Sequence, residues 1–277
     1  MNKHTEEVSA GQRFEFGKNW ARFLSVLNDE RIAEAEKSLK KMLEVETLEG
    51  KSFLDAGSGS GLFSLAARRL GARVHSFDYD PQSVACTKEL KERYFANDGN
   101  WTVEEASVLD RDYIASLGKF EVVYSWGVLH HTGAMWQALE NVVLPVSDGG
   151  RLFISIYNSQ DWKSDFWRRV KGFYCSGRIS MILVTAFFIP FFVIRGLIAD
   201  VLIRRRSPLK RYSEYVKSRG MSRVHDWFDW LGGYPFEVAK PEEIFDFFKE
   251  KGFILEKMKT CGGGHGCNEY VFRAGTK

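Results

Sequence analysis

The stretch from Leu54 to Asp80, LDAGSGSGLFSLAARRLGARVHSFDYD, constrains the fold of this chain more than any other segment. An apolar run closes at Leu54, glycines alternate over the next residues, and Leu62–Leu70 has helical periodicity. A strand, a tight glycine turn and a helix N-terminus together leave backbone N–H groups for a ligand that approaches the backbone closely. A second apolar run ends at Asp78, at the spacing where an acidic residue accepts hydrogen bonds from a ribose diol.

The spacing of the glycines separates two kinds of ligand site. A dinucleotide-binding fold uses G-x-G-x-x-G, whereas this chain has G-x-G-x-G in DAGSGSG. Asp55 precedes the first glycine, where it would repel a pyrophosphate and favour a cationic ligand group. The segment resembles motif I of the class I S-adenosylmethionine (SAM) methyltransferases, whose pattern is close to hhDhGxGxG. Asp78 matches the acidic residue of that family at the end of the second strand.

The resemblance implies SAM as the methyl donor, S-adenosylhomocysteine as the product, and a set of cofactor contacts. Asp55 would face the methionine end of SAM, Asp78 would bind the ribose hydroxyls, and Tyr79 or Val108 would cover the adenine. Two aromatic residues ahead of the motif are expected either in a lid over the cofactor or in a helix packed on the sheet edge. The implied cofactor-binding residues are Asp55, Gly57, Ser58, Gly59, Gly61, Asp78, Tyr79, Ser107, Val108, Ser125, Trp126, Gly127, Trp20 and Phe16.

Strand and helix patterns alternate five times along the chain, which predicts a doubly wound α/β fold with a mainly parallel sheet. A helix over 241–251 and two strands joined by a short loop follow, so the last two strands form an antiparallel hairpin. The resemblance implies a seven-stranded Rossmann-like sheet with an antiparallel last strand. We expect an N-terminal arm and a lid helix (Trp20–Met42) in 1–49, the core in 50–157, a helical insertion after strand 5 in 158–235, and the completing helix and hairpin in 236–277.

The insertion contains an uncharged apolar run, Ile179–Ile194, and a later run, Arg204–Arg223, with eight basic residues and one acidic residue. Pro190 and Arg195 are expected to interrupt the apolar run, which is shorter than the roughly 20 residues of a spanning helix. The insertion therefore has three interpretations: a helical cap packed over the sheet or against a dimer partner through 179–203, a hydrophobic lid for the acceptor, or an element that lies on an anionic membrane.

Three histidines are candidates for the base that takes a proton from the acceptor. His131 follows the fourth strand, His225 stands beside Asp226, and His265 lies in the glycine-rich loop Cys261–Asn268, which is expected at the same rim of the sheet. Cys261, His265 and Cys267 do not have the usual zinc spacing, so no metal is expected.

The predicted function is methyl transfer from SAM to a small, hydrophobic or aromatic acceptor, with a lipid-like molecule as one such acceptor. O-methylation is favoured because the cofactor motifs look most like those of the ubiquinone-pathway O-methyltransferases. The segment VVYSWGVLHHTG lacks the NPPY-type sequence of enzymes that methylate DNA bases. Two alternatives stay open: an RNA or protein methyltransferase guided by the basic run, and a SAM-binding adaptor subunit without catalysis.

The charge balance and the cysteines indicate which partners and which cellular compartment to expect. With 39 basic and 36 acidic residues the net charge is +3, which does not mark a nucleic-acid binder. Four cysteines without regular pairing indicate a reducing compartment, and the N-terminus lacks the apolar core of a secretory signal. We therefore expect a cytoplasmic protein, with contact to a membrane surface as an alternative.

Overall fold

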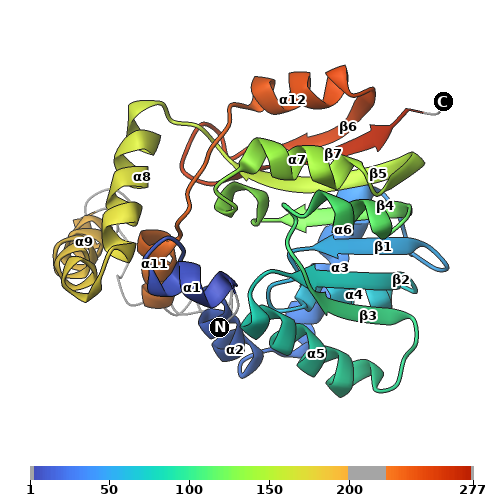
Figure 1. Ribbon diagram of the computed structural model, residues 1–277, viewed down its shortest axis with the longest axis horizontal. Helices are drawn as coiled ribbons and strands as arrows, with labels where there is room; N and C mark the ends of the chain where they lie inside the picture. The colour runs from blue at the N-terminus through green and yellow to red at the C-terminus, as the bar shows by residue number, and fades with distance from the viewer. Residues whose placement is uncertain (1–2, 199–222, 276–277) are drawn as a thin grey trace.

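The computed structural model describes residues 3–198 and 223–275. Its centre is a seven-stranded sheet of order β3-β2-β1-β4-β5-β7-β6 (Figure 1). β7 runs antiparallel to β5 and β6, while the other paired strands are parallel, which confirms the predicted fold. The strands are β1 (Ser52–Ala56), β2 (Arg73–Asp78), β3 (Trp101–Glu105), β4 (Phe120–Trp126), β5 (Val146–Tyr157), β6 (Phe253–Lys259) and β7 (Cys267–Ala274).

Helices cover both faces of the sheet because its central strands are apolar on both sides. In β1, Phe53 belongs to one core cluster and its neighbour Leu54 to the other, as the two-residue period of a strand requires. Phe153 and Ile154 divide in the same way in β5. One cluster contains residues of α3 (Asp29–Leu43), α4 (Leu62–Arg69) and α5 (Pro81–Phe95), and the other contains residues of α6 (Arg111–Ser116), α7 (Met135–Val143) and α12 (Pro241–Glu250).

The N-terminal arm differs from the expectation of one helix over Trp20–Met42. It contains α1 (Lys3–Ser9) and α2 (Gly17–Leu24), and α3 begins afresh at Asp29. The break has a local cause, because the side chain of Asn28 accepts a hydrogen bond of 3.1 Å from the backbone N–H of Arg31 and caps the new helix. The apolar residues on both sides of Asn28 keep a helical spacing, so the sequence indicated a single helix.

The insertion is helical where the structure describes it, with α8 (Trp162–Cys175), α9 (Arg178–Ile198) and α11 (Arg223–Gly232) beside α1 (Figure 1). The expectation that Pro190 and Arg195 interrupt the apolar run is wrong, since α9 is one helix of 21 residues with Pro190 inside it. A proline inside a helix removes one hydrogen bond and its ring crowds the carbonyl four residues earlier, which can kink a helix without ending it. By length and composition α9 would be able to cross a membrane. Most of the basic run lies outside the described residues.

The cap at Asn28 gives a stability prediction. We expect Asn28→Ala to lower the free energy of unfolding by about 1 kcal/mol, because the N–H of Arg31 loses its acceptor. Asn28→Asp should retain the stability of the parent, since aspartate caps equally well. Urea unfolding of the three proteins measures the difference, and an equal loss in both variants would contradict the capping role.

Candidate functional site

A cavity of about 350 Å³ lies at the carboxyl ends of the parallel strands. The loops after β1, β2, β3 and β4 form one side of it, and the N-terminal arm forms the other. The core side comprises Asp55, Gly57, Ser58, Gly59, Ser60, Leu62, Phe63, Phe77, Asp78, Tyr79, Asp80, Ser83, Ala106, Ser107, Val108, Leu109, Tyr124, Trp126, Gly127, Val128, His131 and Thr132. The arm contributes His4, Arg13, Phe14, Phe16, Trp20 and Phe23.

The glycine loop after β1 passes between two side chains that leave no room for a Cβ atom. Gly57 has a φ of 90°, and a Cβ there would lie 2.4 Å from Val128. Gly59 has a φ of 55°, and a Cβ there would lie 3.2 Å from the indole of Trp20. The alternating glycines are therefore required by both the backbone conformation and the close packing.

The N–H groups of this loop are used differently from the sequence expectation. Those of Gly57 and Ser58 donate to the carbonyl of Phe77, at 2.9 and 3.0 Å, and that of Gly59 donates to Oδ2 of Asp78 at 2.9 Å. These three N–H groups connect the end of β1 to the end of β2, so they are not free to donate to a ligand. The loop is thus held in place by the strand that carries Asp78.

Asp78 ends β2 and keeps a partly exposed carboxyl group in the cavity wall. Its Oδ1 accepts a hydrogen bond of 2.9 Å from the N–H of Asp80, and its Oδ2 accepts the one from Gly59. Burial raises the pKa of Asp78 to about 6, and the two hydrogen bonds from the backbone oppose this shift.

Asp55 is only 1% exposed and belongs to a chain of buried polar groups. Ser64 donates to its Oδ2 at 2.5 Å, the hydroxyl of Ser64 lies 2.7 Å from that of Ser76, and the indole N–H of Trp101 donates to Ser76 at 2.9 Å. Burial, together with the nearby charge of Asp78, raises the pKa of Asp55 to about 7, against the lowering effect of the bond from Ser64. A positively charged ligand group would stabilise the ionised form.

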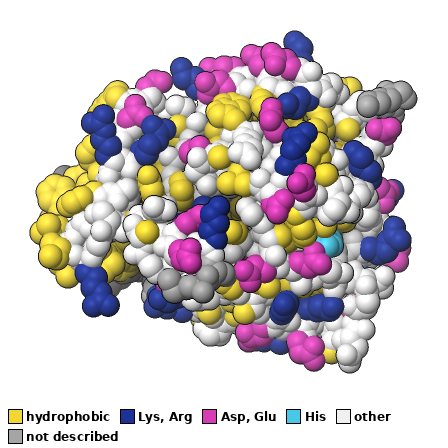
Figure 2. All heavy atoms as spheres, in the orientation of Figure 1, with side chains coloured by type: hydrophobic (Ala, Val, Ile, Leu, Met, Phe, Trp, Pro, Cys, Tyr) yellow, Lys and Arg dark blue, Asp and Glu magenta, His cyan; other side chains and the backbone are white. Residues whose placement is uncertain are grey.

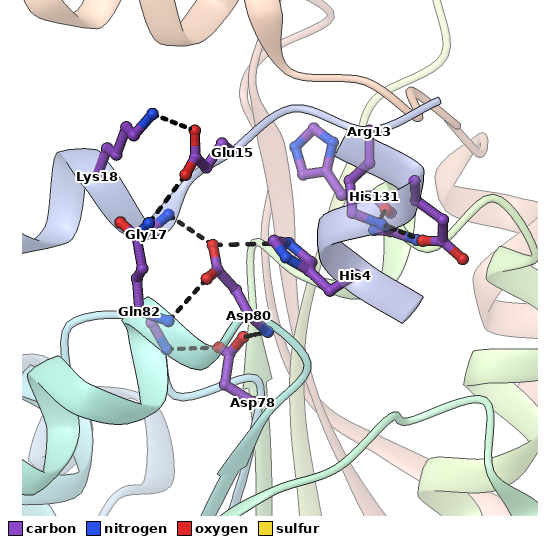
Figure 3. A network of polar contacts seen from close by, with 11 residues as sticks. His4, Arg13, Glu15, Gly17, Lys18, Asp78, Asp80, Gln82 and His131 are labelled. Carbon is purple, nitrogen blue, oxygen red and sulfur yellow. Dashed lines mark hydrogen bonds and ion pairs between the residues drawn. The ribbon is translucent and has the colours of Figure 1, made fainter. Parts of the chain in front are cut away.

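The N-terminal arm is fastened over the cavity at two points (Figure 3). Asp80 accepts hydrogen bonds from the N–H groups of Gly17 and Gln82, at 2.8 and 2.9 Å, and lies 3.6 Å from Nε2 of His4. Arg13 donates to the carbonyls of His131 and Thr132, at 2.8 and 3.3 Å. The arm is therefore held by side-chain contacts to the loops after β2 and β4.

Sequence reasoning missed these fastening residues for different reasons. Asp80 stands directly before Pro81, which is a recognisable cap signal at the start of α5. Arg13 has no comparable signal, because 118 residues separate it from its partner His131. His4 lies in α1, a helix that the polar sequence of the arm did not reveal.

Most of the predicted cofactor-binding residues line the cavity, including Phe16 and Trp20 of the arm. Gly61 and Ser125 are the two that do not. Gly61 is the N-cap residue of α4, and the Ser125 hydroxyl donates to the carbonyl of Ala56 at 2.7 Å. Both support the loops that carry the lining residues, and the cofactor roles implied by the resemblance stay predictions for the whole set.

One of the three candidate histidines lies in the cavity wall. His131 has its Nδ1 atom 2.6 Å from the carbonyl of Pro235, so Nδ1 carries the proton and Nε2 keeps its lone pair. Burial lowers the pKa of His131 to about 3, so the ring is neutral. His265 is exposed and lies edge-on to Trp230, outside the cavity lining. His225 lies in α11, and its side chain is outside the described residues.

A mainly parallel sheet with a glycine loop after β1 and carboxyl groups at the ends of β1 and β2 defines a Rossmann-like ligand-binding domain. Residues 54–152 match the family model described as a methyltransferase domain. The chain therefore contains a class I SAM-dependent methyltransferase domain.

Curated relatives match a part of the chain of similar length. A ribosomal protein L11 methyltransferase of Anoxybacillus flavithermus is 31% identical over 123 residues, which are 39% of this chain and 39% of that protein. A ubiquinone biosynthesis O-methyltransferase of Coxiella burnetii is 28% identical over 120 residues, covering 43% of this chain and 49% of that protein. The chain thus spans less than half of the length of these relatives.

Solved structures with this fold cover more of the chain. The magnesium protoporphyrin IX methyltransferase of Synechocystis with bound S-adenosylhomocysteine has a TM-score of 0.52 at 14% identity, over 88% of this chain and 83% of that one. An O-methyltransferase family protein from Burkholderia thailandensis has a TM-score of 0.53 at 12% identity, over 90% of this chain and 58% of that one. At such identities the similarity establishes the fold.

The raised pKa of Asp55 gives a pH-dependent stability. Between the unfolded value near 4 and the folded value of about 7, the folded state binds the extra proton, so this group makes the protein less stable as the pH rises. From pH 5 to pH 8, we expect the free energy of unfolding to fall by on the order of 2 kcal/mol less in Asp55→Asn than in the parent. Urea unfolding at both pH values measures it, with the exposed Asp246→Asn as the control; identical slopes in all three proteins would contradict the assignment.

Proposed function

We propose that this chain transfers a methyl group from SAM to a hydroxyl group of a small, largely apolar acceptor. The observation that carries the proposal is the composition of the single cavity described above. Its lining combines a glycine loop and two carboxyl groups with raised pKa values with aromatic side chains and a neutral histidine. The carboxyl groups suit a cationic nucleoside, and the aromatic side chains with the histidine suit an apolar molecule that bears a hydroxyl group.

The residues present fit SAM. The raised pKa values of Asp55 and Asp78 mean that a ligand with positive charge and hydroxyl donors would stabilise both carboxylates. Within the described residues, the hydroxyl oxygen of Tyr124 is buried and has no hydrogen-bond partner, although the residue lines the cavity. A ligand carboxylate would give that hydroxyl an acceptor. SAM brings an ammonium group, a ribose diol and a carboxylate.

The roles of the chain follow from these contacts. Asp55 would bind the ammonium group directly or through water, and Asp78 would bind the ribose hydroxyls. Tyr79 or Val108 would cover the adenine, and the segment Trp126–Gly127 would support the methionine part. When bound, SAM supplies an electrophilic methyl group on its sulfonium, so the remaining task of the protein is alignment.

The acceptor has to be argued from the cavity, because the relatives named above act on a ribosomal protein and in ubiquinone biosynthesis. Six aromatic side chains of the arm and β4 line the cavity, and such walls favour flat, apolar ligands. They are Phe14, Phe16, Trp20, Phe23, Tyr124 and Trp126. An RNA or protein acceptor guided by the basic run Arg204–Arg223 is the alternative, and most of that run lies outside the described residues.

His131 is the residue of this cavity best suited to receive the proton of the acceptor. The bond from Nδ1 to Pro235 fixes the tautomer, so Nε2 is the acceptor nitrogen of the ring. Burial lowers its pKa to about 3, which keeps the ring neutral and makes it a weak base, so it would accept the proton only as methyl transfer makes the hydroxyl strongly acidic and would pass it on to water. Nε2 would therefore orient the attacking hydroxyl and take up its proton as the oxygen becomes methylated.

Binding of the cofactor is the first test. We expect Asp78→Ala to weaken SAM binding by about 1–3 kcal/mol, because a charge-assisted hydrogen-bond partner of the ribose is lost. Isothermal titration calorimetry with SAM and S-adenosylhomocysteine measures it. Asp246→Ala, which removes an exposed carboxylate from α12, serves as the control. If the parent binds neither ligand, the proposed function is wrong.

Turnover tests the role of His131. In His131→Asn the amide nitrogen can replace Nδ1 as the donor to Pro235, while the Nε2 lone pair is removed. We expect kcat with a hydrophobic phenol to fall by ~10²–10⁴, with SAM affinity unchanged. His265→Ala should behave as the parent. The opposite result, with activity lost only in His265→Ala, would move the base to the hairpin loop; turnover of ribosomal protein or tRNA but of no phenol would contradict the acceptor class.

A further inference from the structure

One face of α9 carries large hydrophobic side chains that the rest of the described chain leaves exposed. Ile179 is 77% exposed, Phe187 is 67% exposed and Ile182 is 61% exposed. Figure 2 shows hydrophobic side chains gathered at the left end of the molecule, where Figure 1 places α9. The exposed set is Ile179, Met181, Ile182, Leu183, Phe187, Phe191, Ile194, Leu197 and Ile198. Such a concentration on a single helix is unusual for a surface that only water contacts.

The opposite face of α9 is packed against the insertion. Ser180 and Val184 are buried, and Phe188 and Phe192 follow at the same spacing of four residues. The rings of Phe188 and Phe192 lie 5.2 and 6.2 Å from that of Trp167 in α8. Since this contact runs along the helix, α9 would lie flat against a surface with α8 and α11 behind it, instead of crossing a bilayer alone.

The charges around the apolar face are positive. Arg178 begins α9 and Arg195 lies in its last turn, and the sequence contains no acidic residue between Arg178 and Ile198. In α8, Lys163 and Arg169 are further cations, while Asp165 pairs with Arg168, and Lys and Arg side chains with an acidic one among them lie beside the hydrophobic area in Figure 2. The sequence from Arg204 to Arg223 adds eight basic residues against one acidic residue. An apolar helix with a basic border complements anionic lipid headgroups.

We propose that α9 docks this protein flat onto an anionic phospholipid membrane, with its exposed face among the acyl chains and its cations at the headgroups. A second copy of the chain is a poorer occupant, because a two-fold contact would bring the same positive borders together. The proposal goes beyond the proposed function and does not depend on it.

Docking would also bring the cavity close to the lipid. Phe14 lines the cavity and packs against Tyr174 of α8, with ring centroids 6.4 Å apart. Tyr174 in turn belongs to the same hydrophobic cluster as Val184 of α9. The aromatic wall of the cavity is therefore one layer of side chains away from the membrane-facing helix. A lipid-like acceptor would reach such a cavity by a short path.

Flotation of the full chain with vesicles tests the proposal without SAM or turnover. We expect flotation with phosphatidylcholine vesicles that contain phosphatidylglycerol, and much less with phosphatidylcholine alone or at high salt. The double variant Ile182→Glu/Phe187→Glu should bind at least about tenfold more weakly, because two apolar anchors are lost. Ile254→Glu, at a residue of β6 that is 51% exposed, is the matched control and should float like the parent.

The outcomes separate the occupants of the face. Absence of flotation of the parent, or equal flotation of the double variant and the control, would overturn the proposal. A parent that is dimeric in light scattering, does not float, and becomes monomeric in the double variant would assign the face to a second copy. Loss of flotation on neutralising Arg204–Arg206, with the double variant still bound, would assign the membrane contact to the basic run instead. Ile182→Gln/Phe187→Gln replaces the double variant if thermal unfolding shows that it is misfolded.

Discussion

The hydrogen bond from Gly59 to Asp78 is the contact on which the cavity depends. It joins the loop after β1 to the end of β2, where Ala56 and Phe77 already pair in the sheet. The second oxygen of Asp78 accepts from the N–H of Asp80, and Asp80 in turn caps α5 and binds the N-terminal arm through Gly17. A sequence of backbone-to-carboxylate bonds therefore positions the loop, a helix and the arm together.

This arrangement places two carboxyl groups where their charge is poorly solvated. Asp55 is stabilised by Ser64 and Ser76 behind it, yet burial still raises its pKa to about 7. The poorly solvated carboxyl groups therefore lower the stability of the folded protein, and a cationic ligand would offset this loss. Such groups are common in preformed binding sites. The buried hydroxyl of Tyr124, in the lining of the same cavity, likewise has no hydrogen-bond partner among the described residues.

The sequence was sufficient for features that depend on neighbours along the chain. Apolar runs, the alternating glycines and Asp78 follow from local backbone requirements, so the sheet and one side of the cavity could be predicted. Arg13 and His131 could not be paired in advance, because no local rule links residues so far apart. Pro190 was expected from a local rule to interrupt the apolar run, but α9 continues through it while one of its faces packs on α8. The sequence alone did not show that His131 lies in the cavity lining and His265 outside it, because the position of the hairpin loop depends on contacts between distant segments.

The insertion and the N-terminal arm meet at Phe14, which makes the arm part of both the cavity and the cap. Gly232 of α11 approaches the ring of Phe14 so closely that a Cβ atom would lie 2.2 Å from it, and the backbone N–H of Phe14 donates to the carbonyl of Tyr234 at 2.8 Å. A displacement of α9 would therefore also move α8 and α11, which contact the arm that covers the site. The loops after the parallel strands form one side of the cavity, and the arm, which is held against the insertion at Phe14, forms the other.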